Sequence, residues 1–220
     1  MKRLLDLFCK AGGASMGYHM AGFEVVGVDK EPQPNYPFEF IKADALTVDL
    51  SGFDAYAASP PCQGYSITQF QHPGKFHPQL IYPVRDRLRA TGKPYVIENV
   101  ELARDYMYDP VTLCGSSFGL RVRRHRVFET SGFRIPQLAC NHAWQNRHKP
   151  YRLHLSEGRG GERQSGMVPV YGGNQMVGGN EKFYKSVAMG IDWMDPDELN
   201  EAIPPAYTLH IGKALMKQLA

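Results

Sequence analysis

Two short stretches carry side chains that can do covalent chemistry. "SPPCQGYS" presents Cys62 directly after two prolines, which fix backbone φ angles and stiffen the loop that holds the thiol. A thiolate is a nucleophile, although most isolated cysteines are small buried hydrophobic residues. "VIENV" places Glu98 at the end of an apolar segment, where a carboxylate is costly unless it is paired or faces a cleft. The pair predicts a thiolate that attacks an electron-poor ring while an acid supplies that ring with a proton.

Basic side chains gather in two further stretches. "RVRRHR", residues 121–126, holds four arginines and a histidine, and "NRHKPYR", residues 146–152, is a second basic cluster. Arginine binds phosphate and base carbonyls with its planar fork, although a run of charge is often only a solvated face. The net charge of +3 and the pI of about 8.6 are compatible with a polyanionic partner but do not require one.

These residues must be positioned by secondary-structure elements, and strand-like and helix-like patterns alternate along the chain. This alternation predicts an α/β fold with a parallel sheet and helices on both faces, in which ligands bind at the carboxyl ends of the strands. The expected strands are residues 4–8, 23–28, 38–41, 55–58, 95–98, 111–113 and 126–128, and the expected helices are 14–21, 79–91 with an interruption near Pro83, and an amphipathic helix within 202–220. The polar residues that follow strands are Asp29, Asp44, Cys62 and Glu98. We therefore expect these four side chains to meet at one rim of the sheet.

The first part of the chain has the outline of a nucleotide-type cofactor site. In "LLDLFCKAGGASMGYHMAGFEVVGVD", residues 4–29, an apolar run ends in a glycine turn, a helix pattern follows, and a second apolar run ends in Asp29. Lys10 lies inside the glycine turn, which is an unusual position for a lysine.

The cysteines are widely spaced, and "Cys140-x-His142" alone approaches the spacing of a metal site. A lone pair of this kind is usually accidental, so we expect no metal and reduced thiols. No apolar run approaches the ~18 residues that span a bilayer. We expect a monomer without membrane contact in the cytoplasm of a bacterial or phage-infected cell.

Five motifs, taken in order, resemble those of the DNA cytosine-5 methyltransferases, in a compact form with a minimal target-recognition region. "DLFCKAGG" resembles the first motif of that family, and "SPPCQGYS" resembles its catalytic loop. "ENV" matches the family's ENV motif. "RRHRVF" is similar to the arginine motif Q-x-R-x-R, and "EAIPPAYTLHIG" resembles the closing motif. The resemblance covers residues 1–128 and about 186–220. It implies a Rossmann-like S-adenosylmethionine-dependent methyltransferase fold with a small irregular recognition region.

The resemblance also implies a role for each matching residue. Cys62 would attack C6 of a cytosine flipped out of double-stranded DNA, Glu98 would engage N3 and the exocyclic amine, and Arg126 would hold the carbonyl, with Arg124 as its companion. The methyl donor would be S-adenosylmethionine. Its implied binding residues are Phe8, Lys10, Gly12, Gly13, Asp29, Asp44, Pro60 and Glu201. For Asp44, capping of a following helix is the alternative. The candidate DNA contacts are Gln63, Ser66, Arg121, Arg123, Arg147 and Arg152.

Three residues depart from the family pattern. Lys10 replaces a glycine, Val122 replaces the glutamine of the arginine motif, and Glu201 replaces an asparagine of the closing motif. Lys10 and Glu201 are expected to form a pair. Alternatively, Lys10 favours carboxy-S-adenosylmethionine as donor, which would give 5-carboxymethylcytosine. A catalytically silent DNA-binding relative and an enzyme that acts on RNA also stay open.

The change of composition along the chain predicts three parts. Residues 1–133 would form the catalytic and cofactor-binding domain. Residues 134–181, rich in Gly, Asn, Gln, Arg and His, would form the minimal target-recognition region. Residues 182–220 would return to the catalytic domain.

Overall fold

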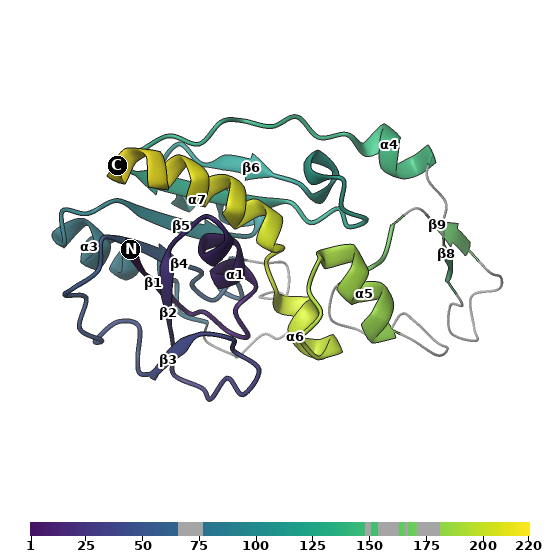
Figure 1. The fold of residues 1–220 in the computed structure, drawn as a ribbon. Helices are drawn as coiled ribbons and strands as arrows, with labels where there is room; N and C mark the ends of the chain where they lie inside the picture. Colours follow the sequence, from purple (N-terminus) through teal and green to yellow (C-terminus); the bar gives the residue numbers. More distant parts are fainter. Residues whose placement is uncertain (66–76, 148–150, 154–162, 166, 171–180) are drawn as a thin grey trace.

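The computed structural model describes residues 1–65, 77–147, 151–153, 163–165, 167–170 and 181–220. For residues 147, 151–153 and 163–165 it describes the backbone alone. The described segments form a seven-stranded sheet with helices packed on it, and a second, two-stranded sheet (Figure 1).

The large sheet has the strand order β3-β2-β1-β4-β5-β7-β6. Its strands are β1 (Arg3–Leu7), β2 (Glu24–Asp29), β3 (Glu39–Lys42), β4 (Ala55–Ala58), β5 (Tyr95–Asn99), β6 (Val111–Leu113) and β7 (Arg126–Ser131). The first five pair in parallel, whereas β7 runs antiparallel to both β5 and β6. The prediction of an entirely parallel sheet is therefore wrong at this edge. A parallel crossover needs a helix-length connection, and the segments between β5, β6 and β7 hold only short 3-10 helices.

The helices lie on both faces of the sheet and beyond one of its ends. They are α1 (Gly13–Met20), α3 (Ile81–Ala90), α4 (His142–Arg147), α5 (Glu181–Met189), α6 (Pro196–Glu201) and α7 (Pro205–Leu219), with 3-10 helices η1 (Glu101–Tyr106) and η2 (Gly115–Phe118). The second sheet pairs β8 (Tyr151–Leu153) with β9 (Arg163–Ser165). Within the described ranges, no helix is long and apolar enough to cross a membrane.

Alternating side chains of β1 fill two cores, one on each face of the sheet. Leu5 and Leu7 belong to the cluster that also holds Ile81 of α3. Leu4 belongs to the opposite cluster, with Tyr18 of α1 and Tyr207 of α7. The alternation follows from the two-residue period of a strand. It confirms the expectation of helices on both faces.

Helix α3 is continuous, and the interruption expected near Pro83 does not occur. Pro83 is the third residue of the helix, in the first turn, where its missing N–H has no partner to lose. Helix α7 is amphipathic as expected and buries Tyr207, Ile211 and Leu215. It packs on α1 through Gly17, where a Cβ would lie 2.0 Å from the hydroxyl of Thr208.

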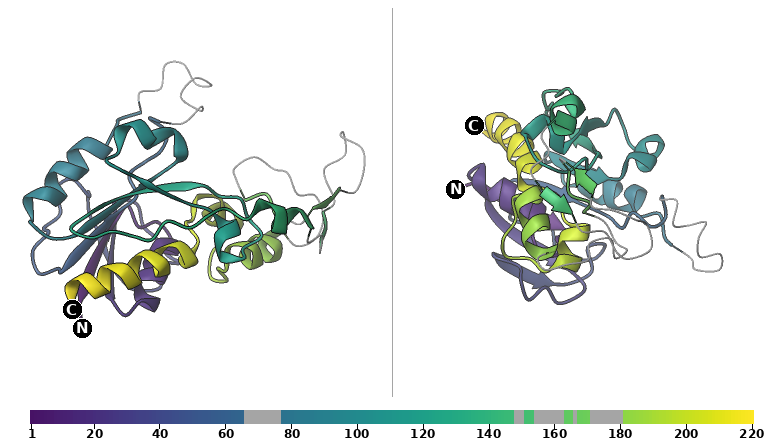
Figure 2. Two further views of the ribbon diagram at one scale, coloured as in Figure 1. Left: turned by 90° about the horizontal axis from the view of Figure 1, so that it is seen from above. Right: turned by 90° about the vertical axis from the view of Figure 1, so that its right-hand side faces the viewer.

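The remaining elements extend the molecule beyond one end of the sheet (Figure 2). Here α4 and the β8–β9 pair follow the seven-stranded sheet in sequence, and α5 leads back toward α6 and α7. A third apolar cluster, which includes Val122, Val170 and Met189, joins this end to the arginine segment and to the glycine loop through Ala11. The three-part division at residues 133/134 and 181/182 stays a prediction.

Candidate active site

A cavity of about 510 Å³ opens at the carboxyl ends of the parallel strands. Its lining includes all four polar residues that were expected to meet at the rim: Asp29, Asp44, Cys62 and Glu98. This convergence follows from the parallel direction of β1, β2, β3, β4 and β5, which brings the ends of the strands to one edge.

Cys62 is half-buried in the loop that follows β4, and this loop is fixed to the neighbouring strand. The side-chain amide of Asn99, at the end of β5, donates to the carbonyl oxygen of Pro60 over 3.0 Å. Asn99 is buried, so this bond is shielded from water. The "PPC" loop and the "ENV" strand end are thus held in one geometry, and Pro60 and Cys62 both line the cavity.

Glu98 and Arg126 form an ion pair across the β5–β7 edge. Arg126 Nε lies 3.0 Å from Glu98 Oε1, and both side chains are largely buried. Burial raises the pKa of Glu98, and the positive charges of Arg126 and Arg124 oppose this rise. The carboxyl group is therefore readier to hold a proton than an exposed glutamate is.

Arg124 is buried beside the same site. Its guanidinium donates to the carbonyl oxygens of Val170 (2.6 Å) and Asn200 (2.5 Å), and its own carbonyl accepts from the Tyr207 hydroxyl. Its Nε has no hydrogen-bond partner among the described residues. Burial and the neighbouring Arg126 lower the pKa of Arg124 to about 9, which leaves the group charged at neutral pH.

Burial and neighbouring charges shift the pKa of Cys62 in opposite directions. Burial raises the pKa of the thiol and the charge of Glu98 adds to the rise, whereas Arg126 lowers it. The thiol therefore stays protonated in the resting protein at neutral pH, and neutralisation of Glu98 would favour the thiolate.

The glycine turn after β1 adopts a left-handed backbone at residues that are not glycine. Phe8 has φ 61° and Lys10 has φ 47°, and both line the cavity. The backbone N–H of Lys10 donates to Oδ2 of Asp29 over 3.3 Å, so the acid that ends β2 supports the turn. At Gly13 a Cβ would lie 2.6 Å from the carbonyl oxygen of Ile203, which requires glycine at this lining position.

Gly12 differs from the other glycine that was predicted to bind the cofactor, Gly13. Gly12 is not among the residues that line the cavity. It is the N-cap residue that precedes α1, with φ 84°, and a Cβ there would press on the ring of Tyr36. Its direct contact with a cofactor stays a prediction.

Lys10 and Glu201 form the expected pair. The Lys10 Nζ lies 3.5 Å from Glu201 Oε2 at the rim of the cavity. The side chains are 55% and 62% exposed, so the pair is a surface ion pair rather than a buried one. The positive charge in the glycine turn therefore has a counter-charge within the protein.

Asp44 lines the cavity, as expected of a residue that meets a ligand. Its Oδ1 accepts from the backbone N–H of Leu46 over 2.8 Å within a turn. No helix begins there, so the alternative prediction of a helix cap is wrong. Contact of Asp44 with a cofactor stays a prediction.

The sequence reasoning missed Asp6, an acid in the middle of the apolar strand β1. Asp6 is buried, lines the cavity, and accepts a hydrogen bond from Ser15, which in turn accepts from the Tyr36 hydroxyl. Its Oδ1 has no partner among the described residues. Burial raises the pKa of Asp6 to about 7. An acid inside "LLDLF" was the available signal, because an acid on a buried strand is costly unless it serves a site.

The structure describes the side chains of only some of the residues that were predicted to contact DNA. Gln63 lines the cavity next to Cys62. The Arg121 guanidinium lies 5.7 Å from the ring centre of Trp144, and Arg123 donates to the Gln145 side chain over 3.0 Å. Ser66 lies outside the described residues, as do the side chains of Arg147 and Arg152.

Val122, which stands in place of the usual glutamine, is buried in the third apolar cluster. Gln145 of α4 is also buried, and its amide donates to the carbonyl oxygens of Leu120 and Val122. A glutamine side chain therefore does meet the arginine segment, but it comes from a different part of the chain.

Comparison with known proteins gives partial matches in sequence and full-length matches in structure. No family model matches the chain. Among curated proteins it is similar to the type II methyltransferases M.AgeI of Thalassovita gelatinovora (27% identity over 57% of this chain) and M.XorII of Xanthomonas oryzae (29% over 56%). The matched segments cover 38% and 30% of those proteins, so the chain spans about a third of their length. A third relative, M.AquIA of Picosynechococcus, is 26% identical over 62% of this chain and 68% of its own length.

Two solved structures match the chain over its whole length. One is a protein provisionally described as a DNA modification methyltransferase encoded within an E. coli prophage, with a TM-score of 0.68, 14% identity, and coverage of 100% and 99% of the two chains. The other is the Entamoeba histolytica methyltransferase EhMeth, with a TM-score of 0.56, 11% identity and the same coverage. These matches confirm the predicted fold class: the chain has the Rossmann-like fold of methyltransferases.

Proposed function

We propose that the protein is a DNA cytosine-5 methyltransferase that transfers a methyl group from S-adenosylmethionine to C5 of a flipped cytosine through a covalent adduct with Cys62. The observation that carries the proposal is the gathering of Cys62, Glu98 and Arg126 in one cavity, with Glu98 and Arg126 paired at 3.0 Å. The similarity to type II methyltransferases supports DNA as the substrate, and bacterial relatives agree with a cytoplasmic protein.

The cavity fits S-adenosylmethionine in its chemistry. A buried carboxylate oxygen of Asp6 faces no partner among the described residues, and Gly13 leaves no room for a side chain where the backbone must come close to a ligand. Asp29 and Asp44 would accept hydrogen bonds from the ribose and the adenine amine, and Phe8 would pack on the adenosine. When bound, the donor supplies an electrophilic methyl group on its sulfonium.

The residues of the chain would divide the reaction between them. The Cys62 thiol gives its proton to water and adds as a thiolate to C6 of the cytosine, which makes C5 nucleophilic, while Glu98 shares a proton with N3 as negative charge develops in the ring. Arg126 donates to the cytosine carbonyl. After transfer, C5 loses its proton to water and the Cys62 thiolate departs, which restores the aromatic ring. The raised pKa of Glu98 suits a group that supplies a proton at neutral pH.

The pairing of Lys10 favours methyl over carboxymethyl transfer. A donor whose transferred group carries a carboxylate would need an unpaired cation beside that group. Glu201 lies 3.5 Å from the Lys10 ammonium and already supplies the opposite charge.

Trapping with 5-fluorocytosine DNA tests the proposal directly. Fluorine at C5 cannot leave as a proton would, so the wild-type protein incubated with donor and this DNA should form a complex that survives denaturing electrophoresis. Cys62→Ser should form none, although it should still bind DNA in a mobility-shift assay. Mass spectrometry of nucleosides from ordinary DNA should then show 5-methylcytosine with S-adenosylmethionine as donor.

Other outcomes would decide for the alternatives. DNA binding by the wild-type protein without a covalent complex would indicate a catalytically silent relative. Faster modification of RNA than of DNA in a competition assay would move the substrate to RNA. 5-Carboxymethylcytosine formed in preference to 5-methylcytosine, when both donors are supplied, would reverse the assignment of the donor.

A further inference from the structure

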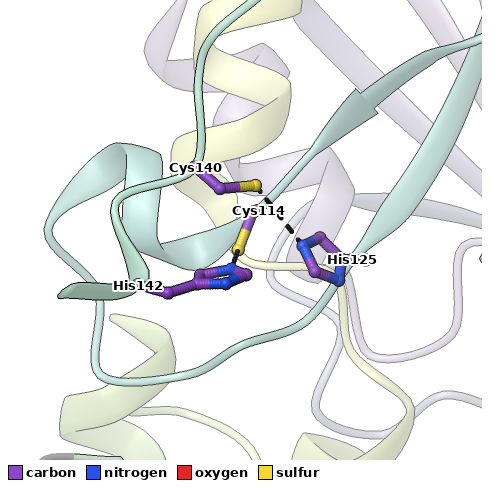
Figure 3. Close-up of side chains that lie close together, drawn as sticks. All are labelled: Cys114, His125, Cys140 and His142. Atoms are coloured by element: carbon purple, nitrogen blue, oxygen red, sulfur yellow. Dashed lines mark hydrogen bonds between the residues drawn. The ribbon is translucent and has the colours of Figure 1, made fainter. Parts of the chain in front are cut away.

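Four side chains that could bind a metal ion come from three separate parts of the sequence and meet near the start of β7. They are Cys114, His125, Cys140 and His142, and their ligand atoms all lie within 4.8 Å of one another (Figure 3). Only the last two approach the spacing of a metal site in the sequence, and they were expected to be an accidental pair. The fold supplies the two missing ligands.

The antiparallel pairing of β6 and β7 explains how Cys114 and His125 meet. Leu113, the last residue of β6, lies opposite Arg126, the first residue of β7. The next residue outward on each strand is therefore Cys114 on one side and His125 on the other. Cys140 and His142 reach the same point at the start of α4, because Asn141 between them donates its backbone N–H to Ser116 Oγ over 2.9 Å.

The distances fit a tetrahedral zinc ion. Cys114 Sγ lies 3.4 Å from His142 Nε2, and Cys140 Sγ lies 3.4 Å from His125 Nε2. Zinc bonds of ~2.3 Å to sulfur and ~2.0 Å to nitrogen in a tetrahedron place sulfur and nitrogen about 3.5 Å apart. Figure 3 shows the two sulfur atoms and the two rings directed toward one another. Two thiolates and two imidazoles are a common ligand set for structural zinc.

Neighbouring polar groups are arranged as the outer shell of a metal site. Ser116 Oγ lies 3.1 Å from Cys114 Sγ and can donate to a thiolate there. His125 turns Nε2 toward the cluster and Nδ1 toward the Glu101 carboxylate, 3.8 Å away. A carboxylate behind a ligating histidine fixes the ring orientation and raises its basicity.

We infer that Cys114, His125, Cys140 and His142 bind a structural zinc ion. All four positions of a tetrahedral ion are filled by the protein, so the ion has no open site for catalysis. Zinc joins the end of β6 and the start of β7 to the segment that leads into α4. Because His125 lies between Arg124 and Arg126, the ion also fixes the base-binding arginine segment, and its four ligands are positioning residues.

Metal analysis of the whole chain, prepared without a polyhistidine tag and in reductant, tests the inference. The protein should contain or take up about one zinc per chain, and cobalt should replace zinc with the visible spectrum of a tetrahedral thiolate complex. The Cys140→Ser variant, which lacks an exposed ligand, should no longer bind zinc tightly. Cys62→Ser and His19→Gln remove the same groups elsewhere and should keep the stoichiometry of the wild type.

A second pair of variants separates metal binding from folding. Glu101→Gln and Ser116→Ala leave all four ligands in place and should weaken zinc binding by about 10–100-fold, measured by competition with a chelator. The inference is overturned if the reduced wild-type protein takes up no zinc or cobalt, or if Cys140→Ser binds zinc as tightly as the wild type. A Cys114–Cys140 disulfide that persists in reductant would also overturn it.

Discussion

Replacement of Lys10 by glycine should stabilise the protein, although it removes an ion pair. Lys10 has φ 47°, a left-handed conformation that costs a residue with a Cβ about 1–2 kcal/mol and costs glycine almost nothing. Glycine loses more freedom on folding, which offsets about 0.5–1 kcal/mol of this gain. The surface pair with Glu201 contributes about 0.5 kcal/mol. The net expectation for Lys10→Gly is a small gain of about 0.25 kcal/mol.

Lys10→Ala is the matched control, because it removes the ammonium but keeps the Cβ. It should lose about 0.5 kcal/mol relative to the wild type, so that the glycine variant exceeds the alanine variant by about 0.75 kcal/mol. For a chain of 220 residues this difference corresponds to about 1.5–3 °C in Tm. Urea denaturation and thermal unfolding of the three proteins without ligand provide the measurement. A glycine variant less stable than the alanine variant would refute the reasoning from the backbone.

Two further predictions concern charges buried in the sheet. Arg85 and Glu129 are almost fully buried and paired at 2.6 Å, so Glu129→Ala should cost about 3–5 kcal/mol in urea denaturation, because it leaves the guanidinium without its partner; a loss below about 1 kcal/mol would contradict this. Glu98→Gln should lower the pKa of Cys62 and move its pH-dependent alkylation by iodoacetamide to lower pH, whereas Arg126→Gln should move it to higher pH. The second shift should be smaller, because Glu98 without Arg126 takes up a proton more readily. Shifts in the same direction in both variants would exclude the proposed charge balance.

The part of the sheet that could be predicted is the part where the strands run parallel, as the alternation of strands and helices indicates. The five parallel strands were found because each is a short apolar run that ends in a turn, and the parallel direction alone brought Asp29, Asp44, Cys62 and Glu98 to one rim. The reversal at β7 was missed, because strand direction depends on the connection and not on the strand's own residues.

The site was predictable where a residue departs from its surroundings. Lys10 and Glu201 were predicted to pair because both depart from the family pattern and because the resemblance brings their motifs together, and the ion pair is present. Asp6 was assigned to an apolar run, although an acid on a strand buried on both faces is costly unless it serves a site. Cys114 and His125 could not be matched from spacing, since the β6–β7 register and not the interval between them brings them together.

The arginine segment, residues 121–126, is held from several sides. The Tyr207 hydroxyl of α7 donates to the Arg124 carbonyl over 2.6 Å, and Gln145 of α4 donates to the carbonyl of Val122 over 3.0 Å. The zinc site would fix His125 from the same direction as α4. A side chain that meets a flipped base must be in place before the base arrives, since ordering it afterwards would add to the energy of flipping. The segment that supplies Arg126 is therefore held by α7 on one side and by α4 on the other, so that a change in either should reach the ion pair with Glu98.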